Sequence, residues 1–181
     1  MKKLIVTLMI CGLTICCNNS NNRIETDLYN CMIDSLTEEE KEKTIIIFKE
    51  YEEHLVEKGI LESRESISYW KFYKKIADTG TYDFTNNFDF FEKIEFLERA
   101  DPADNDYIYD CNNHLLQTER YKQSRLFQYS KEMESLKRHK ITPVIMAKIT
   151  IKHLRKEDFE LDYYRFLTLG FIEKNKIKHR E

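Results

Sequence analysis

Glycine and proline are scarce in this chain, whose 181 residues include four Gly and two Pro. Turns draw on these two residue types for their special backbone dihedrals, and a sheet protein of this length needs many turns. The scarcity therefore argues against a sandwich or a barrel and favours long helices. It also argues against the glycine-rich loops that bind phosphates or dinucleotides, because those loops need several glycines close together.

Familiar catalytic patterns are missing as well. The chain holds no HExxH and no GxSxG pattern, and its five histidines are scattered. Pairs of carboxylates are common, but 32 Asp and Glu make such pairs expected by chance. The sequence therefore names no reaction and no cofactor, and the absence of motifs favours a role other than catalysis.

The overall composition indicates one soluble domain. Apolar residues make up 41% of the chain and charged residues 34%, which is enough apolar material for a core and too much charge for a polytopic membrane protein. Together with the shortage of turn residues, this predicts an all-α fold, a bundle of five to seven amphipathic helices.

The first residues, MKKLIVTLMICGLTICC, have the anatomy of a signal peptide. Two lysines precede an apolar run from Leu4 to Ile15, which is too short to span a bilayer, and two cysteines and a polar stretch follow. This pattern resembles the lipobox of bacterial lipoproteins. The resemblance implies that residues 1–16 are cleaved and that Cys17 carries the lipid, with Cys16 as the alternative register.

The lipobox resemblance implies an acylated protein, with palmitate-type chains holding it on a membrane of the bacterial cell envelope. Each buried methylene of an acyl chain adds about 0.8 kcal/mol, so several chains together anchor a protein without a transmembrane helix. The body would face the periplasm or the cell surface. An ordinary secretory signal and an uncleaved N-terminal anchor remain the alternatives.

Cleavage and lipidation at Cys17 leave two cysteines, Cys31 and Cys111. Disulfides persist outside the cytoplasm, so these two residues form a candidate bridge. In the chain-entropy model, a loop of this length contributes roughly 4 kcal/mol. The alternative is that each cysteine is a small buried side chain on a helix face.

Hydrophobic periodicity and helix-terminal signals predict a series of helices. The best start signal is Thr37 with Glu40 three residues later, a capping box. Glycines serve as expected helix stops. The first two predicted helices span 37–58 and 64–79 and end at Gly59 and Gly80. A third lies around Phe88 to Leu97 and is closed by Asp101–Pro102. Three more span 105–119, 122–138 and 157–169, and the last of them ends at Gly170.

Residues 144–152 fit both a strand and a helix, because apolar side chains recur at either spacing. We expect a helix, since Thr142–Pro143 is a good helix start. The predicted organisation is a signal peptide over 1–16, a polar tether and short amphipathic lead-in over 17–36, a single helical domain over 37–172 and a charged, frayed tail over 173–181.

Charge is unevenly distributed. Residues 37–111 hold 20 acidic and 10 basic side chains, whereas residues 137–181 hold 12 basic and 6 acidic ones. The basic end suggests an interaction patch for anionic lipids or an acidic partner. The alternative, which we favour, is pairing with the acidic helices of the same bundle. The net negative charge of the chain argues against binding to nucleic acid. The residues of the basic interaction patch are Lys148, Lys152, Arg155 and Lys156.

Three further clusters were weighed as sites. Asp110 and His114 lie four residues apart, but one histidine and one carboxylate are too few for a metal. An acidic run lacks the glycine and glutamate of a calcium loop. An aromatic cluster suits core packing better than ligand stacking, and His54 suits the edge of the core. We therefore expect no metal site. The acidic run is Asp101, Asp104, Asp106 and Asp110, and the aromatic cluster is Trp70, Phe72 and Tyr73.

These observations favour a binding or interaction module of the cell envelope, tethered to a membrane by its N-terminal lipid and contacting an envelope protein. Two other roles remain open. One is a hydrolase of envelope polymers that uses Asp and Glu residues. The other is an immunity-type or inhibitor lipoprotein, which small acidic lipid-anchored domains suit.

Overall fold

The structure, a computed structural model, describes residues 23–97, 102–136 and 141–176. Every regular element in these ranges is helical, which confirms the all-α fold. The α-helices are α1 Ile24–Asp34, α2 Glu38–Glu57, α3 Ser66–Thr79, α4 Phe90–Lys93, α5 Pro102–Gln117, α6 Glu119–Lys122, α7 Arg125–Ser135, α8 Pro143–His153 and α9 Asp162–Lys174, with 3-10 turns η2 Glu95–Leu97 and η3 Lys156–Glu160. The candidate lipidation sites Cys17 and Cys16 lie outside the described residues.

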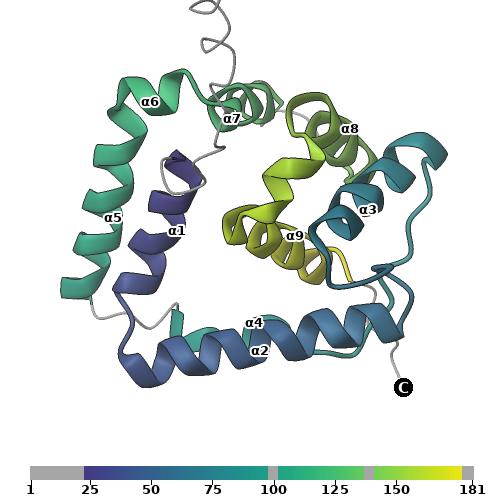
Figure 1. Ribbon diagram of the computed structural model, residues 1–181, viewed down its shortest axis with the longest axis horizontal. Helices are drawn as coiled ribbons and strands as arrows, with labels where there is room; N and C mark the ends of the chain where they lie inside the picture. Colours follow the sequence, from purple (N-terminus) through teal and green to yellow (C-terminus); the bar gives the residue numbers. More distant parts are fainter. Residues whose placement is uncertain (1–22, 98–101, 137–140, 177–181) are drawn as a thin grey trace, which may run out of the picture.

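The helices surround a common core (Figure 1). Helix α2 runs along one side of the molecule, and the short helices α6 and α7 lie on the opposite side. Helices α1 and α5 lie side by side, while α3 packs against α8 and η3. Helix α9 contacts both groups, because it packs on α1 as well as on α3 and η3.

Aromatic side chains dominate the core. Tyr51 from α2 stacks on Phe90 with ring centroids 4.6 Å apart, and Phe84 contacts Phe171 edge-on. Offset stacked and edge-on geometries are those that ring quadrupoles favour. Of the cluster weighed as a ligand platform, Phe72 and Tyr73 are buried in this core and Trp70 is half-buried at its edge, as core packing predicts.

Helix α2 begins and ends where the sequence predicts. The Thr37 side chain accepts a hydrogen bond from the Glu40 backbone, and the Glu40 carboxylate accepts one from the Thr37 backbone, so both halves of the capping box are present. After the helix, Gly59 adopts a positive φ of 68°. Ile47, Tyr51 and Leu55, at helical spacing along α2, are all buried.

Replacing Thr37 with Ala is expected to lower the free energy of unfolding by about 1 kcal/mol, because the Glu40 backbone N–H loses its side-chain acceptor and the Glu40 carboxylate loses a hydroxyl donor. Urea titration followed by far-ultraviolet circular dichroism measures the change. Thr79→Ala is the matched control, since Thr79 is exposed near the end of α3 and caps no helix start. An equal loss in both variants would contradict the capping role.

Residues 144–152 form the helix α8, as expected from its start signal. The Thr142 side chain caps the helix by accepting from the Ile145 backbone at 3.3 Å, and Pro143 occupies the first turn. The predicted helix over 122–138 corresponds to α7, which begins later than predicted, at Arg125, after the short helix α6 has ended at Lys122. Ser124 makes the break, because its hydroxyl caps α7 by accepting from the Phe127 backbone.

The third predicted helix, Phe88 to Leu97, is interrupted. It forms the single turn α4 and the 3-10 turn η2, and residues 81–89 before them are not helical. Two side chains bond the local backbone there: the Asp83 carboxylate accepts from Thr85, and the Asn86 amide oxygen accepts from Phe88. Such local bonds compete with a helix. The expected stop Pro102 is the first residue of α5 instead.

Gly170 is also a wrong stop, because α9 continues through it to Lys174. The residues that follow, Phe171 and Ile172, are buried and hold the last turn against the core. Tertiary burial here outweighs the low helix propensity of glycine. By contrast Gly80, with a φ of 69°, ends α3 as predicted.

Both predicted domain boundaries need correction. The lead-in assigned to 17–36 contains α1, whose Ile24 and Leu28 belong to the core, so the domain includes residues before 37. At the other end, the first residues of the tail assigned to 173–181 pack on the domain, because Glu173 is buried and the Lys176 ammonium bonds Asp89 at 2.9 Å.

Candidate functional site

A disulfide joins Cys31 of α1 to Cys111 of α5, with Cα atoms 6.0 Å apart. One end of the same helix pair is tied a second time, because Arg120 just after α5 pairs with Asp27 of α1. The two helices are therefore held as a rigid unit across 80 residues of sequence.

An apolar groove of about 350 Å³ opens between this helix pair and α9. None of the eight side chains that line it carries an ionisable carboxylate, amine or guanidine. Leu116 and Leu167 on its walls keep 39% and 38% of their surface exposed. The lining residues are Leu28, Tyr29, Met32, Asn112, Leu116, Tyr163, Phe166 and Leu167.

The two tyrosines of the groove are neutral at physiological pH. Burial raises the pKa of Tyr29 to about 12, with a smaller contribution from the nearby Asp162. Burial likewise raises the pKa of Tyr163 above its ordinary value. A charged ligand group therefore finds no counter-ion among the lining residues, whereas an apolar one displaces water from the leucine, methionine and phenylalanine surfaces.

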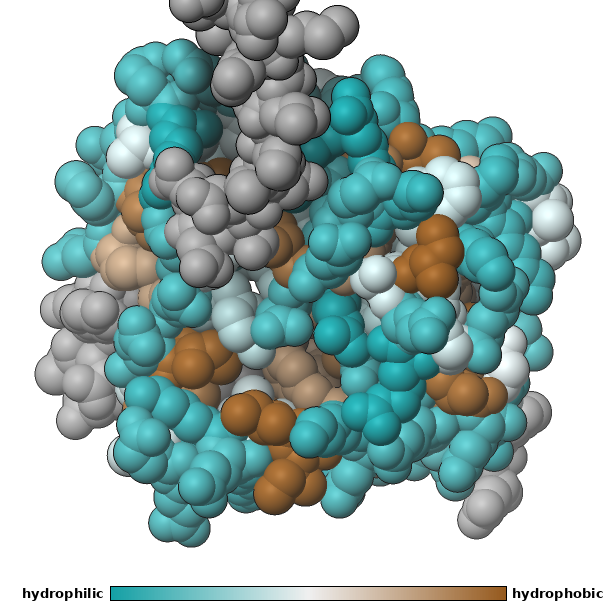
Figure 2. Space-filling model, in the orientation of Figure 1, coloured by the Kyte–Doolittle hydropathy of each residue, from teal (hydrophilic) through white to brown (hydrophobic). Residues whose placement is uncertain are grey.

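Other apolar side chains are exposed away from the groove. Figure 2 shows separate hydrophobic patches on a mostly hydrophilic face, one of them over α2. On α2, Ile45 and Ile46 keep 53% and 55% of their surface exposed. They line neither of the cavities described here, and they provide a comparison for the groove.

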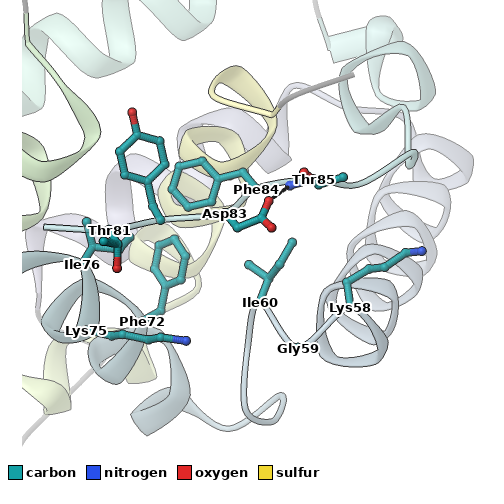
Figure 3. Close-up of a pocket in the computed structure, with 11 residues that line it drawn as sticks. Lys58, Gly59, Ile60, Phe72, Lys75, Ile76, Thr81, Asp83, Phe84 and Thr85 are labelled. Carbon is teal, nitrogen blue, oxygen red and sulfur yellow. Dashed lines mark hydrogen bonds between the residues drawn. The ribbon is translucent and has the colours of Figure 1, made fainter. Parts of the chain in front are cut away.

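A second cavity of about 230 Å³ lies between the end of α2, α3 and residues 81–85. Figure 3 shows Ile60, Phe72 and Phe84 around a common space, while the Lys58 side chain points away from it. The lining holds one carboxylate, Asp83, which already accepts a backbone hydrogen bond from Thr85 at 2.8 Å. The cavity thus lacks the paired carboxylates that glycoside hydrolysis needs.

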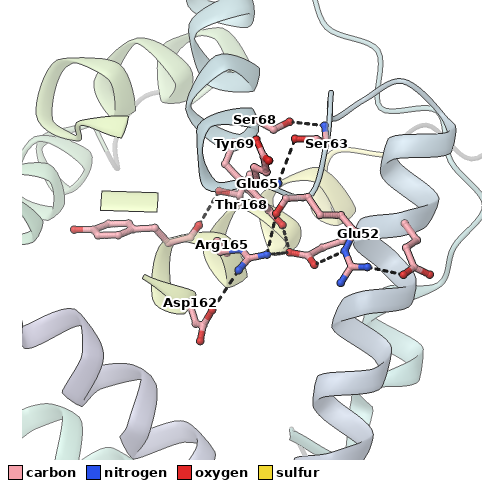
Figure 4. Close-up of polar contacts among 11 residues, drawn as sticks. Glu52, Ser63, Glu65, Ser68, Tyr69, Asp162, Arg165 and Thr168 are labelled. Carbon is pink, nitrogen blue, oxygen red and sulfur yellow. Dashed lines mark hydrogen bonds and ion pairs between the residues drawn. The ribbon is translucent and has the colours of Figure 1, made fainter. Parts of the chain in front are cut away.

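Buried carboxylates lie instead in ion-pair networks between helices. Glu52 of α2 accepts from the Tyr69 hydroxyl and from Arg165 of α9 at 2.5 Å, and it pairs with Arg64 (Figure 4). Burial raises the pKa of Tyr69, so this phenol stays a donor. The network joins α2, α3 and α9.

A second ion-pair network lies around Arg23, the first described residue. Arg23 donates to Asp158 at 2.6 Å and to Glu25 at 2.8 Å, and Tyr164 donates to Glu25. Burial alone would raise the pKa of Glu25, but these hydrogen bonds outweigh it and hold the pKa below its ordinary value. Glu25 is therefore ionised and paired, unlike a general acid, which needs a raised pKa.

The other candidates from the sequence lie on α5 and at the edge of the core. Asp110 and His114 are exposed on α5, and the described part of the chain holds no group of three metal-ligating side chains. Asp104 and Asp106 lie on α5, while Asp101 is outside the described residues. The His54 ring packs on Phe88 at the core edge, as expected, and burial lowers its pKa.

The predicted basic patch is exposed but only partly paired. Lys152 bonds Glu132 of α7 at 2.6 Å, and Lys156 lies 3.7 Å from Glu157. Lys148 and Arg155 form no ion pair with the described residues. The expected pairing of these four side chains with the acidic helices of residues 37–111 does not occur among the described contacts.

Sequence reasoning missed the groove. Tyr163 and Phe166 are half-buried where α9 meets the groove. The walls come from segments around residues 28–32, 112–116 and 163–167, which no local pattern connects. The cysteine pair was the one available signal, because a bridge predicts that α1 and α5 are neighbours.

No described helix combines the length and the apolar character needed to cross a bilayer. Comparisons with protein-family models, curated proteins and solved structures found no match to this chain.

Proposed function

We propose that the protein is a lipid-anchored binding module of the bacterial cell envelope, and that it holds an apolar segment of an envelope protein in the groove between α1, α5 and α9. The observation that carries the proposal is a groove of about 350 Å³ lined by no charged side chain. The signal-peptide pattern ending in Cys17 supports the anchor. The disulfide supports an oxidising compartment.

Binding accounts for the site better than catalysis does. A hydrolase acting through carboxylates needs two of them converging on one cavity, one with a raised pKa. The groove has none, the second cavity has one, and Glu25 has a lowered pKa. An apolar groove with exposed leucines, by contrast, is the kind of surface that marks an interaction site.

The shape of the groove suits one face of a helix. Amphipathic helices dock by placing apolar side chains at helical spacing into a groove between helices. Here leucines on α5 and α9 flank the opening, and the Asn112 amide and the tyrosines supply polar contacts within it. The Cys31–Cys111 bridge holds one wall in place before binding, which reduces the entropy lost on docking.

The test replaces both wall leucines with charged residues. Leu116→Asp/Leu167→Asp is expected to abolish crosslinking of the lipidated protein to its envelope partner, because two carboxylates would be desolvated on docking. Ile45→Asp/Ile46→Asp is the matched control, with the same chemical change at two exposed apolar positions on α2. Crosslinking in cells, followed by mass spectrometry, measures capture and maps the crosslinked peptide.

The proposal requires the crosslinked partner peptide to be apolar on one helical face and to disappear only in the groove variant. Capture that survives Leu116→Asp/Leu167→Asp but is lost in Ile45→Asp/Ile46→Asp would place the site on α2. Capture unchanged in both variants would also overturn the groove as the binding site. Circular dichroism confirms that each variant is folded before the comparison is made.

A further inference from the structure

The described residues of α6, α7, α8 and the start of η3 form a strongly basic surface. Within 119–136 and 141–156 there are eight Lys and Arg against three Asp and Glu. Seven of the eight basic side chains are exposed, and the eighth, Arg125, is half-buried. This basic surface consists of Arg120, Lys122, Arg125, Lys131, Lys148, Lys152, Arg155 and Lys156.

The opposite side of the molecule is acidic. Helix α2 carries eight glutamates against three lysines, and it lies across the molecule from α6 and α7 (Figure 1). Several basic-surface residues have ion-pair partners, but Lys131, Lys148 and Arg155 have none among the described residues. The fold thus places the basic side chains on one side of the molecule and the acidic α2 on the opposite side.

The chain enters the domain at the basic side. Arg23, the first described residue, donates to Asp158 of η3, and Arg125 at the start of α7 pairs with the same carboxylate at 3.1 Å. Arg23 follows the proposed lipidation site Cys17 by six positions in the sequence. Fully extended, this stretch reaches about 20 Å. An anchored domain therefore holds this side close to the bilayer.

From this placement we infer that the basic surface rests on the anionic phospholipid headgroups of the membrane that holds the anchor. The orientation rests on the proposed lipidation of Cys17, whereas the surface itself does not. Basic side chains are attracted to anionic headgroups within a screening length of about 10 Å, which a short tether makes accessible. The acidic α2 then faces away from the membrane, where its charge is not repelled.

The test compares lipidated, full-length mature protein in vesicles of neutral phosphatidylcholine and in vesicles containing phosphatidylglycerol. A water-soluble amine-acylating reagent reports the exposure of each lysine by mass spectrometry. Acylation of Lys148 and Lys152 is expected to slow about fivefold in the anionic vesicles. Lys49 and Lys75 on α2 and α3 are expected to react equally in both. High salt should abolish the difference.

Charge reversals provide matched variants. Lys148→Glu/Lys152→Glu/Lys156→Glu is expected to remove the protection of Lys131 in anionic vesicles. Lys49→Glu/Lys58→Glu/Lys75→Glu changes the net charge equally and leaves that protection intact. Loss in both variants would mean that net charge, rather than this surface, determines binding, and would overturn the inference.

Equal acylation of Lys148 and Lys152 in the two kinds of vesicle would also overturn it and would leave an acidic protein as the partner of the basic surface. Whether the anchor is present is decided by a separate measurement, mass spectrometry of the N-terminus. An unmodified N-terminus refutes lipidation, while protection of these lysines on anionic vesicles still decides whether the basic surface binds lipid headgroups.

Discussion

Breaking the Cys31–Cys111 disulfide is expected to lower the free energy of unfolding by about 4 kcal/mol. The bridge spans a sequence separation of 80 residues, so its removal releases a long loop in the unfolded chain. The native state also loses one of its ties between α1 and α5. Urea titration with and without reducing agent measures the change, with helix content followed by circular dichroism.

A variant with both cysteines replaced, Cys31→Ser/Cys111→Ser, is the control. It should be destabilised to a similar extent and should not respond to reducing agent. The groove should loosen as well, because the bridge fixes the wall that carries Leu116. Two free thiols in the denatured, unreduced protein, or equal stability before and after reduction, would contradict this account.

Asp158→Ala is expected to destabilise the protein by about 3 kcal/mol. The carboxylate is 0% exposed and pairs with the guanidinium groups of Arg23 and Arg125, while its second oxygen accepts from the Arg155 backbone at 2.7 Å. Breaking a buried pair from one side leaves its partners uncompensated. The expected loss is at the low end for such pairs because both arginines are partly exposed.

Asp27→Ala is the matched control, since Asp27 also pairs with an arginine but both partners are about a third exposed. Its expected cost is under about 1 kcal/mol. Thermal and urea unfolding of the two variants measure the difference. Equal losses would show that burial of Asp158 contributes nothing beyond a surface ion pair, which would contradict the tie between the N-terminus, η3 and α7.

Local signals predicted the helices that local physics controls. Helix α2 has a complete capping box at Thr37 and a glycine stop at Gly59. Helix α8 has its threonine cap and a proline in the first turn. In each case the side chain that starts the helix is within four residues of the groups it bonds, so sequence alone identifies it.

Elements controlled by distant contacts were not predictable in the same way. The sequence of α1 predicts only a short lead-in, yet Glu25 is only 2% exposed and bonds Tyr164, which lies 139 residues away. Gly170 was read as a stop, although the buried Ile172 holds the helix beyond it. Propensity is a weak guide wherever tertiary burial decides.

The site was the least predictable part. Its walls come from three helices that are distant in sequence, and only the cysteine pair linked two of them. The basic patch was recognised as a charge run, but its position beside Arg23 required the contacts of Asp158. Sequence thus identified four of the eight residues of the basic surface and could not place them relative to the anchor.

Mass spectrometry of the mature N-terminal peptide tests the central claim, that this is a lipid-anchored module, most directly. The predicted result is a chain that begins at Cys17 and carries a thioether-linked diacylglycerol. A lipid on Cys16 would shift the cleavage by one residue and keep the anchor. An unmodified terminus, or a chain that retains residues 1–16, would contradict the account.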